Sequence, residues 1–424
     1  MMAMLRAVLS HRDFRFLWLG QSVSVIGDRL VVVALALFVT DLTGNASDLG
    51  LVLAAYTLPL VGFLLLGGVW ADRLPRHRVV IGTDLIRFAL HALLAVLILT
   101  DAVQVWHVVA IEACFGTAEA FFRPAMTGLL PQTVPEDQLQ EANAVFSMTQ
   151  NLAEFAGPAL GTLLVVGLGP GTAFAFDALT FLVSAAFLTQ VRPRARGELA
   201  ERRTVLSELL DGFREVRSRA WVWVTISVFS LAIMLALAPY FVLGPTVARE
   251  QYGATSTYGV LAAVFGAGAV GGALAGLRWR PRRPMRTAML VVTLWPLSVV
   301  LFALGAPLWV VCPALLTGGC SVALFEIWWL TALAEHVPPQ LLSRVTAYDW
   351  MGSLGLLPVG YLLAGPAAGL LGASEVLAGG ATLGLLTILL GLVPRETRDL
   401  RRSERGAQSA RNSATPSSGV EASA

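Results

Sequence analysis

The chain of 424 residues is 56% hydrophobic and only 14% charged, and its mean hydropathy is +0.70. About a quarter of the residues in a soluble domain are charged, so this composition excludes a soluble globular protein and predicts a membrane protein. The formal net charge of +2 is close to zero, so the positions of the charges are more informative than their sum.

Apolar stretches of helical length follow one another along the chain. A helix needs about 20 apolar residues to cross a bilayer core of about 30 Å. The first half contains six such stretches, at 14–40, 48–71, 79–100, 104–130, 141–166 and 170–191. Six more follow a polar segment, at 221–248, 255–277, 287–306, 308–334, 342–368 and 372–393. The predicted fold class is an all-α membrane protein with twelve transmembrane helices in two six-helix halves.

Arginines lie before the first span and after the second, sixth, eighth and twelfth spans, whereas the alternate loops carry almost none. The positive-inside rule therefore predicts that both termini face the cytoplasm. The chain contains no lysine, which is typical of GC-rich bacterial coding, so we expect a multi-pass protein of the bacterial inner membrane. The predicted domains are an N-terminal bundle (1–191), a cytoplasmic linker with an amphipathic helix (192–219), a C-terminal bundle (220–394) and a disordered cytoplasmic tail (395–424). The amphipathic helix is predicted from the i, i+3, i+4, i+7 spacing of Leu206, Leu209, Leu210 and Phe213.

The two halves contain matching residues at equivalent positions. Aligning one half on the other pairs Gly116 with Gly319, Phe122 with Phe325, Leu130 with Leu333, Val134 with Val337, Pro135 with Pro338, Leu139 with Leu342, Ala144 with Ala347 and Gly157 with Gly360. The Val-Pro pair that enters an equivalent loop in each half is harder to ascribe to composition than the single apolar matches. Two units of the same orientation form a parallel repeat, which some transporters use to build a site between halves that move against each other.

A charged loop interrupts the apolar pattern between the second and third spans. The segment GGVWADRLPRHR (67–78) resembles the loop signature of the major facilitator superfamily, with departures at Pro75 and His77. The matching residues are Gly68, Asp72, Arg73, Arg76 and Arg78. The resemblance implies a gating loop, in which Gly68 allows close helix contact and Asp72 faces Arg344 and the start of the eleventh helix. The alternative is an ordinary loop of positive charges at the cytoplasmic surface.

A second motif lies in the fifth span. Gly157, Pro158 and Gly161 are similar to the antiporter motif of the same superfamily, although Thr162 replaces its final glycine. The segment 121–145 is similar to the subgroup that contains macrolide efflux proteins and the enterobactin exporter. This resemblance implies export, and the alternative for the motif is a simple proline bend in the helix.

Charged residues inside the spans are the candidates for function, because each costs about 3 kcal/mol at the centre of a membrane. The candidates for proton coupling or a substrate cavity are Asp28, Arg29, Glu112, Glu119 and Glu154. Adjacent residues on a helix point about 100° apart, so Arg29 and Asp28 cannot both face the same place. We therefore expect Arg29 to pair with a carboxylate elsewhere and Asp28 to face the cavity. A carboxyl group in an apolar cavity can exchange protons near neutral pH, which suits proton antiport. The alternative for Asp28 is that Arg29 beside it neutralises its charge or that it forms a salt bridge to another helix.

A second charged set lies nearer the cytoplasm: Asp84, Arg87, Arg123, Glu326 and Arg344. Arg123 and Glu326 occupy equivalent positions of the repeat with opposite charge, which allows a salt bridge between the halves. The alternative, which the spacing favours, is that Arg123 pairs with Glu119 one turn away. The second half is expected to supply mainly apolar and aromatic walls, with Trp295, Trp328, Trp329 and Trp350 as candidates.

These features predict a secondary transporter that exports a small hydrophobic or amphipathic molecule, such as a drug, macrolide or siderophore, in exchange for protons. The sequence contains no phosphate-binding loop and no metal-ligand spacing among its histidines and cysteines, so we expect no enzyme activity, cofactor or metal. The expected partners are the substrate, protons and the lipid bilayer, without nucleic acid, and the expected state is a monomer. An importer or facilitator of the same fold and a non-transporting membrane scaffold or sensor are the alternatives.

Overall fold

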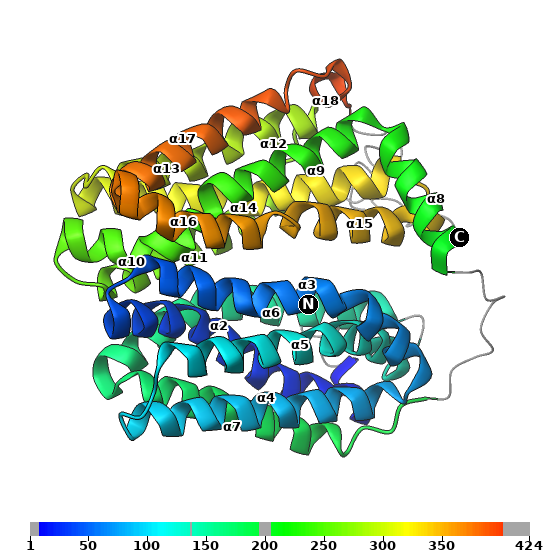
Figure 1. Cartoon of the computed structure of the whole chain (residues 1–424). Coiled ribbons are helices and arrows are strands. Elements are labelled where there is room, and N and C mark those ends of the chain that lie inside the picture. Colours follow the sequence, from blue (N-terminus) through cyan, green and yellow to red (C-terminus); the bar gives the residue numbers. More distant parts are fainter. Residues whose placement is uncertain (1–7, 136–137, 195–204, 402–424) are drawn as a thin grey trace, which may run out of the picture.

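The structure, a computed structural model, describes residues 8–135, 138–194 and 205–401 (Figure 1). Within these ranges all regular structure is helical, and 12 helical segments are long and apolar enough to cross a membrane. The predicted number of spans is therefore confirmed. Their ends differ by only a few residues from those expected, because hydropathy marks where each helix leaves the apolar layer.

Apart from the segment between Leu188 and Ala220, the spans follow one another with short connections. The first six spans are α2 (Arg12–Thr43), α3 (Ala46–Arg73), α4 (Arg76–Leu99), α5 (Val105–Leu129, followed by the turn η1, Leu130–Gln132), α6 (Leu139–Leu168) and α7 (Pro170–Leu188). The second six are α9 (Ala220–Ala232) with η3 (Ile233–Leu237) and α10 (Ala238–Tyr252), α11 (Ser256–Arg278), α12 (Pro284–Val292) with α13 (Leu294–Ala303), α14 (Leu308–His336), α15 (Pro339–Leu354) with α16 (Leu357–Leu371), and α17 (Ala373–Leu390). Two shorter helices are α8 (Val205–Ser218) and α18 (Arg395–Asp399).

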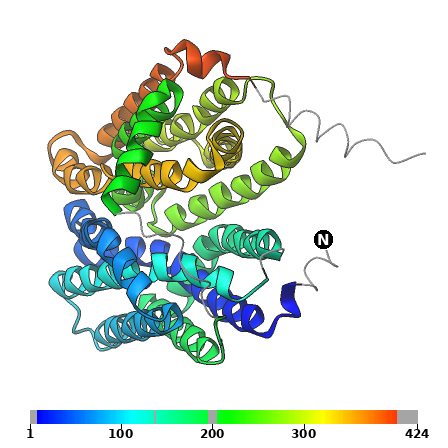
Figure 2. The ribbon, with the colours of Figure 1, turned by 90° about the vertical axis from the view of Figure 1, so that its right-hand side faces the viewer.

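Helices α2 to α7 lie together in Figure 1, and helices α8 to α18 form a second group beside them. The view along the molecule in Figure 2 shows the same two groups. Within the first group α3 packs along α5 and α4 along α7, and within the second α11 packs along α14. Contacts between the groups run mainly from α3 to α16 and from α6 to α11.

Glycines of the sequence repeat bring equivalent helices together in both groups. A side chain at Gly116 of α5 would overlap the backbone of Tyr56 on α3, and one at Gly319 of α14 would overlap the backbone of Phe265 on α11. Small residues of this kind let membrane helices approach backbone to backbone. Each glycine therefore fixes the crossing of the second and fourth spans of its own group.

The buried apolar residues fall into three clusters. The largest joins both groups at one end of the molecule, and it combines residues of α2 and α3 with residues of α10, α11 and α16. The other two lie towards the opposite end, and each contains residues of one group only: positions 8–191 in one and positions 216–388 in the other. The two groups therefore share a core at one end and have separate cores at the other.

The segments outside the spans are partly described. Helix α8 packs on α15, where the ring centroids of Phe213 and Tyr348 are 6.0 Å apart. The side chains of Leu206, Leu209 and Leu210 lie outside the described residues. Part of the predicted tail is ordered, because α18 packs against α12 and Thr397 is buried. The remainder, 402–424, is outside the described ranges.

Candidate functional site

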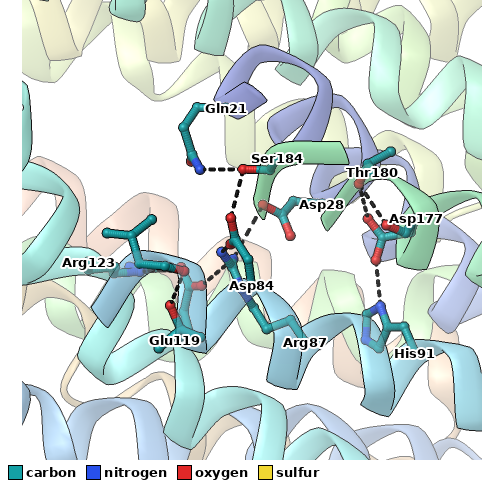
Figure 3. A network of polar contacts seen from close by, with 12 residues as sticks. Gln21, Asp28, Asp84, Arg87, His91, Glu119, Arg123, Asp177, Thr180 and Ser184 are labelled. Atoms are coloured by element: carbon teal, nitrogen blue, oxygen red, sulfur yellow. Dashed lines mark hydrogen bonds and ion pairs between the residues drawn. The ribbon is translucent and has the colours of Figure 1, made fainter. Parts of the chain in front are cut away.

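Four helices of the first group bring charged side chains together inside the membrane-spanning region (Figure 3). At the centre is Arg87 of α4, whose side chain is fully buried. Its guanidinium forms an ion pair with Asp84, one turn earlier on α4, and Nη1 donates to Glu119 Oε2 of α5 at 3.0 Å. Nη1 lies 3.9 Å from Asp28 Oδ2 of α2. Three carboxylates from three helices therefore surround one guanidinium.

Aromatic rings hold this guanidinium in place. The Arg87 Cζ atom lies 3.9 Å from the ring centroid of Phe122 on α5 and 4.5 Å from that of Phe181 on α7. A guanidinium over the face of an aromatic ring is attracted by the ring quadrupole, and the planar group stacks well there. Arg87 is therefore a fixed positive charge, so changes in the network must occur at its carboxylates.

Asp84 is held by a chain of hydrogen bonds. Ser184 Oγ of α7 donates to Asp84 Oδ2 at 2.7 Å, and Gln21 Nε2 of α2 donates to Ser184 Oγ at 2.8 Å (Figure 3). The carboxyl group of Asp84 is fully buried. Because it has an arginine and a hydroxyl as partners, Asp84 is best suited to a permanent structural charge.

Asp28 is the least constrained carboxylate of the network. About a third of its side chain (33%) is exposed, compared with 12% for Glu119 and 0% for Asp84. At 3.9 Å it is also the most distant from Arg87. A group with water access and a loose ion pair can change protonation without breaking a hydrogen bond, which is the property a coupling residue needs.

Arg29 points to a different helix from Asp28, as expected from their adjacent positions. Its Nη2 lies 2.9 Å from Glu154 Oε1 on α6, and both side chains are about half exposed. Gly157 explains how the helices come so close, because a side chain there would overlap Arg29. Gly161 approaches the backbone of Leu30 in the same way. The two glycines that resemble the antiporter motif therefore lie in the contact between α6 and α2.

A second buried cluster contains a histidine that the sequence reasoning missed. His91 Nδ1 of α4 lies 2.5 Å from Asp177 Oδ2 of α7, and His91 Nε2 lies 3.7 Å from Glu112 Oε1 of α5. The imidazole stacks on Phe115, with ring centroids 4.2 Å apart. A signal was present, because Asp84, Arg87 and His91 are spaced i, i+3, i+7 and so share one helix face.

Of the remaining candidates, Arg123 joins the Arg87 network through Glu119, and Glu326 and Arg344 lie on helices of the second group. Arg123 Nε donates to Glu119 Oε1 at 2.8 Å, so Arg123 pairs locally. Glu326 is exposed on α14 and lies within electrostatic range of Glu154 and Asp349. Arg344 lies on α15, where its Cβ contacts the position of Gly212 on α8.

The aromatic walls expected in the second group are mostly core residues. Trp295, Trp328 and Trp329 are buried, because neighbouring helices cover them. Trp329 Nε1 also donates to Asp349 Oδ2 at 2.8 Å. Trp350 is 57% exposed, so it alone of the four named tryptophans has a largely open side chain.

The gating-loop residues lie where α3 ends and α4 begins. In this conformation a side chain at Gly68 would meet open space, whereas one at Gly67 would overlap the backbone of Ala120 on α5, so Gly67 and not Gly68 makes the close helix contact here. The two positions point about 100° apart on α3, and only Gly67 faces α5. Arg76 Nη1 donates to Gly128 O at 2.6 Å and so anchors the loop to α5.

The other gating-loop residues are Asp72, Arg73 and Arg78. Arg73 and Arg78 are exposed. The side chain of Asp72 lies outside the described residues, so its contact with Arg344 stays a prediction.

Within residues 8–135, 138–194 and 205–401, no group of three or more histidine, cysteine, aspartate or glutamate residues could hold a metal ion. The charged clusters are instead ion-paired or hydrogen-bonded within the protein.

The helical architecture is shared with solved membrane transporters. A bacterial homologue of the human lysosomal transporter Spinster, solved in an inward-facing and unoccupied conformation, superposes with a TM-score of 0.67 over 90% of this chain and 95% of that chain at 15% identity. The nucleoside transporter NupG superposes with a TM-score of 0.68 over 89% and 98% at 13% identity. These likenesses show the shared fold.

The chain belongs to the family of transmembrane secretion effectors, which matches residues 4–420. Macrolide efflux protein A of Streptococcus pyogenes is 25% identical over 360 residues, which cover 82% of this chain and 88% of the relative. The multidrug efflux pump Tap of Mycolicibacterium fortuitum is 29% identical over 393 residues, which cover 87% and 91%. The protein is therefore a multi-pass membrane transporter with efflux proteins among its relatives.

Proposed function

We propose that the protein exports a small hydrophobic or amphipathic molecule from the bacterial cytoplasm in exchange for protons. The observation that carries this proposal is the position of Asp28, a partly exposed carboxylate beside the immobile guanidinium of Arg87 in the spanning region. When Asp28 loses its proton, its attraction to Arg87 strengthens, so its protonation state changes the forces between α2 and α4. The efflux relatives support export and a drug-like or macrolide-like substrate.

The buried clusters support alternating access by two six-helix halves, residues 1–191 and 220–394. The halves share a core at one end only, so this conformation is closed at that end. The separate cores lie at the end where the arginine-rich loops meet the ends of α3, α7 and α11. By the positive-inside rule this end is cytoplasmic, with both termini on the same side, and the conformation is inward-facing.

Polar and glycine contacts close the opposite end. Thr255 Oγ1 donates to Asp41 Oδ1 at 2.7 Å between α11 and α2. A side chain at Gly365 of α16 would overlap the backbone of Ser47 on α3, and one at Gly50 would overlap the carbonyl of Tyr361. These contacts must separate when the halves rock and the outer side opens.

The test uses purified protein in liposomes with an imposed pH gradient and follows the movement of macrolides, lipophilic cations and siderophores. We expect the gradient to drive substrate movement in the wild type, and Asp28→Asn to fold and bind substrate but to lose at least about tenfold of the gradient-driven rate. Asp101→Asn is the matched control, because Asp101 lies in a loop with a positive φ of 54°, which asparagine also adopts.

The outcomes separate the alternatives. Equal substrate movement with and without a gradient would show a facilitator and would overturn proton antiport. Loss of folding in Asp28→Asn with no transport by the wild type would favour a membrane scaffold, because the carboxylate would then have only a structural role.

A further inference from the structure

The cluster of His91, Glu112 and Asp177 lies deeper in the protein than Asp28. The side chains of His91, Glu112 and Asp177 are 2%, 5% and 0% exposed. Asp177 Oδ2 is 2.5 Å from His91 Nδ1, so an ionised Asp177 fixes the proton of the ring on Nδ1. The other ring nitrogen, Nε2, then presents a lone pair.

That lone pair faces a second acceptor. Nε2 lies 3.7 Å from Glu112 Oε1, and among the described residues neither atom has a hydrogen-bond partner. When Glu112 is ionised and the ring is neutral, two lone pairs face each other inside an apolar site, which is unfavourable. One proton on either atom turns this repulsion into an attraction, and a hydrogen bond forms between Nε2 and Oε1 once their separation of 3.7 Å shortens.

Carboxylates outnumber arginines around His91 and Glu112, which favours binding of such a proton. The charged and titratable groups that face this cluster or adjoin it are Asp28 and Arg29 on α2, Tyr56 on α3, Asp84 and Arg87 on α4, Glu119 and Arg123 on α5, and Asp177 on α7. Together with Glu112 they include five carboxylates. Arg87 and Arg123 can offset two of these, and Arg29 is paired with Glu154. Of the other three, Asp177 accepts the hydrogen bond of His91 Nδ1, so Asp28 and Glu112 are the two that a proton would neutralise.

We propose that His91 Nε2 and Glu112 Oε1 bind one exchangeable proton at a site separate from Asp28, with Asp177 positioning the imidazole. This proposal rests on the proton antiport proposed above and adds a second proton to it. When the proton is bound, it links α4 to α5, because His91 and Glu112 lie on those two helices. Loss of the proton leaves a repulsive pair and loosens that contact. The Phe115 ring, one turn from Glu112, keeps the imidazole in the plane in which Nε2 faces α5.

The direct test is ¹⁵N NMR of the full-length protein, labelled at histidine nitrogen and held in lipid nanodiscs, with His91→Gln used to assign the resonance. In the wild type we expect Nε2 to change between an acceptor and a protonated nitrogen as the pH is varied. Glu112→Gln places an amide N–H donor against Nε2, so its resonance should stay at the acceptor value throughout. Glu112→Asp retains the carboxyl group and should restore the titration. Asp28→Asn should leave the titration of His91 Nε2 unchanged, because Asp28 is separate from the His91–Glu112 site.

Transport provides the second readout. In proteoliposomes that move erythromycin, Glu112→Gln should reduce the number of protons exchanged per erythromycin by one and leave erythromycin binding unchanged. An Nε2 titration that is identical in the wild type and Glu112→Gln would overturn the inference. If Asp28→Asn uncouples transport while Glu112→Gln keeps the full proton count, the inference fails and the proposed function stands. If the pH gradient moves no substrate in the wild type, antiport fails, and the NMR titration still decides whether the pair binds a proton.

Discussion

Arg123 donates to Glu119 on its own helix at 2.8 Å, although Glu326 occupies the equivalent position in the other half with the opposite charge. The local pair needs only the i, i+4 geometry of α5, whereas the pair with Glu326 would require the halves to meet at their separated ends. We therefore expect Arg123→Ala and Glu119→Gln to be coupled in a double-mutant cycle by about 0.5 kcal/mol, since Arg123 is 44% exposed and its pair is screened.

A second double-mutant cycle combines Arg123→Ala with Glu326→Gln. In this cycle we expect the effects of the two substitutions on thermal stability in detergent to be additive. A charge exchange, Arg123→Glu with Glu326→Arg, should not recover the stability or activity lost by the single changes. Recovery would show that these residues form a salt bridge between the halves in another conformation.

Removal of the Arg87 guanidinium should strongly reduce the stability of the protein. Arg87→Ala leaves Asp84 and Glu119 buried without their partner, and loss of one member of a buried ion pair costs about 3–5 kcal/mol. Arg87→Lys retains the charge but loses the planar group that stacks on Phe122, so we expect intermediate stability. Thermal unfolding of the purified variants measures both. Arg29→Ala is the control, because Arg29 is 44% exposed and should change stability by less than about 1 kcal/mol. Equal effects of Arg87→Ala and Arg29→Ala would contradict the central role of Arg87.

The contacts that close the outer end of the protein should depend on Gly365 and not on Gly369, one turn later on α16. A methyl group at Gly365 would overlap Ser47 of the other half, whereas one at Gly369 meets open space. Spin labels at Asp101→Cys and Leu304→Cys, in a background without the native cysteines, report the distance between the halves at this end. Gly365→Ala should lengthen that distance by a few ångströms, and Gly369→Ala should leave it unchanged. No change in Gly365→Ala would mean that the contact does not hold the end closed.

Gly67 and Gly68 should differ in the same manner at the other end of α3. Gly67→Ala places a methyl group against the backbone of Ala120 and should destabilise the protein by about 1–3 kcal/mol. Gly68→Ala meets no atom in this conformation and should be tolerated here, with a stability within about 0.5 kcal/mol of the wild type. If Gly68→Ala nevertheless abolishes transport, Gly68 is required in a conformation in which it contacts another helix, as the gating-loop hypothesis predicts.

The sequence by itself determined the number of spans, their approximate ends and the set of charged residues inside them. These follow from local properties, because a run of apolar residues and the cost of a charge in lipid do not depend on which helices are neighbours. The equivalence of Gly116 and Gly319 was also visible in the sequence, and both make the same kind of helix contact in the structure.

Only the tertiary structure decided which charges meet. The partners of Arg87 come from α2, α4 and α5, and the rotation of each helix about its axis is set by packing that no local pattern specifies. For the same reason Gly67 took the contact expected of Gly68, three of the four tryptophans became core residues, and His91 proved to lie between two carboxylates. Helix periodicity places side chains on a face, but the neighbour of that face is a property of the whole fold.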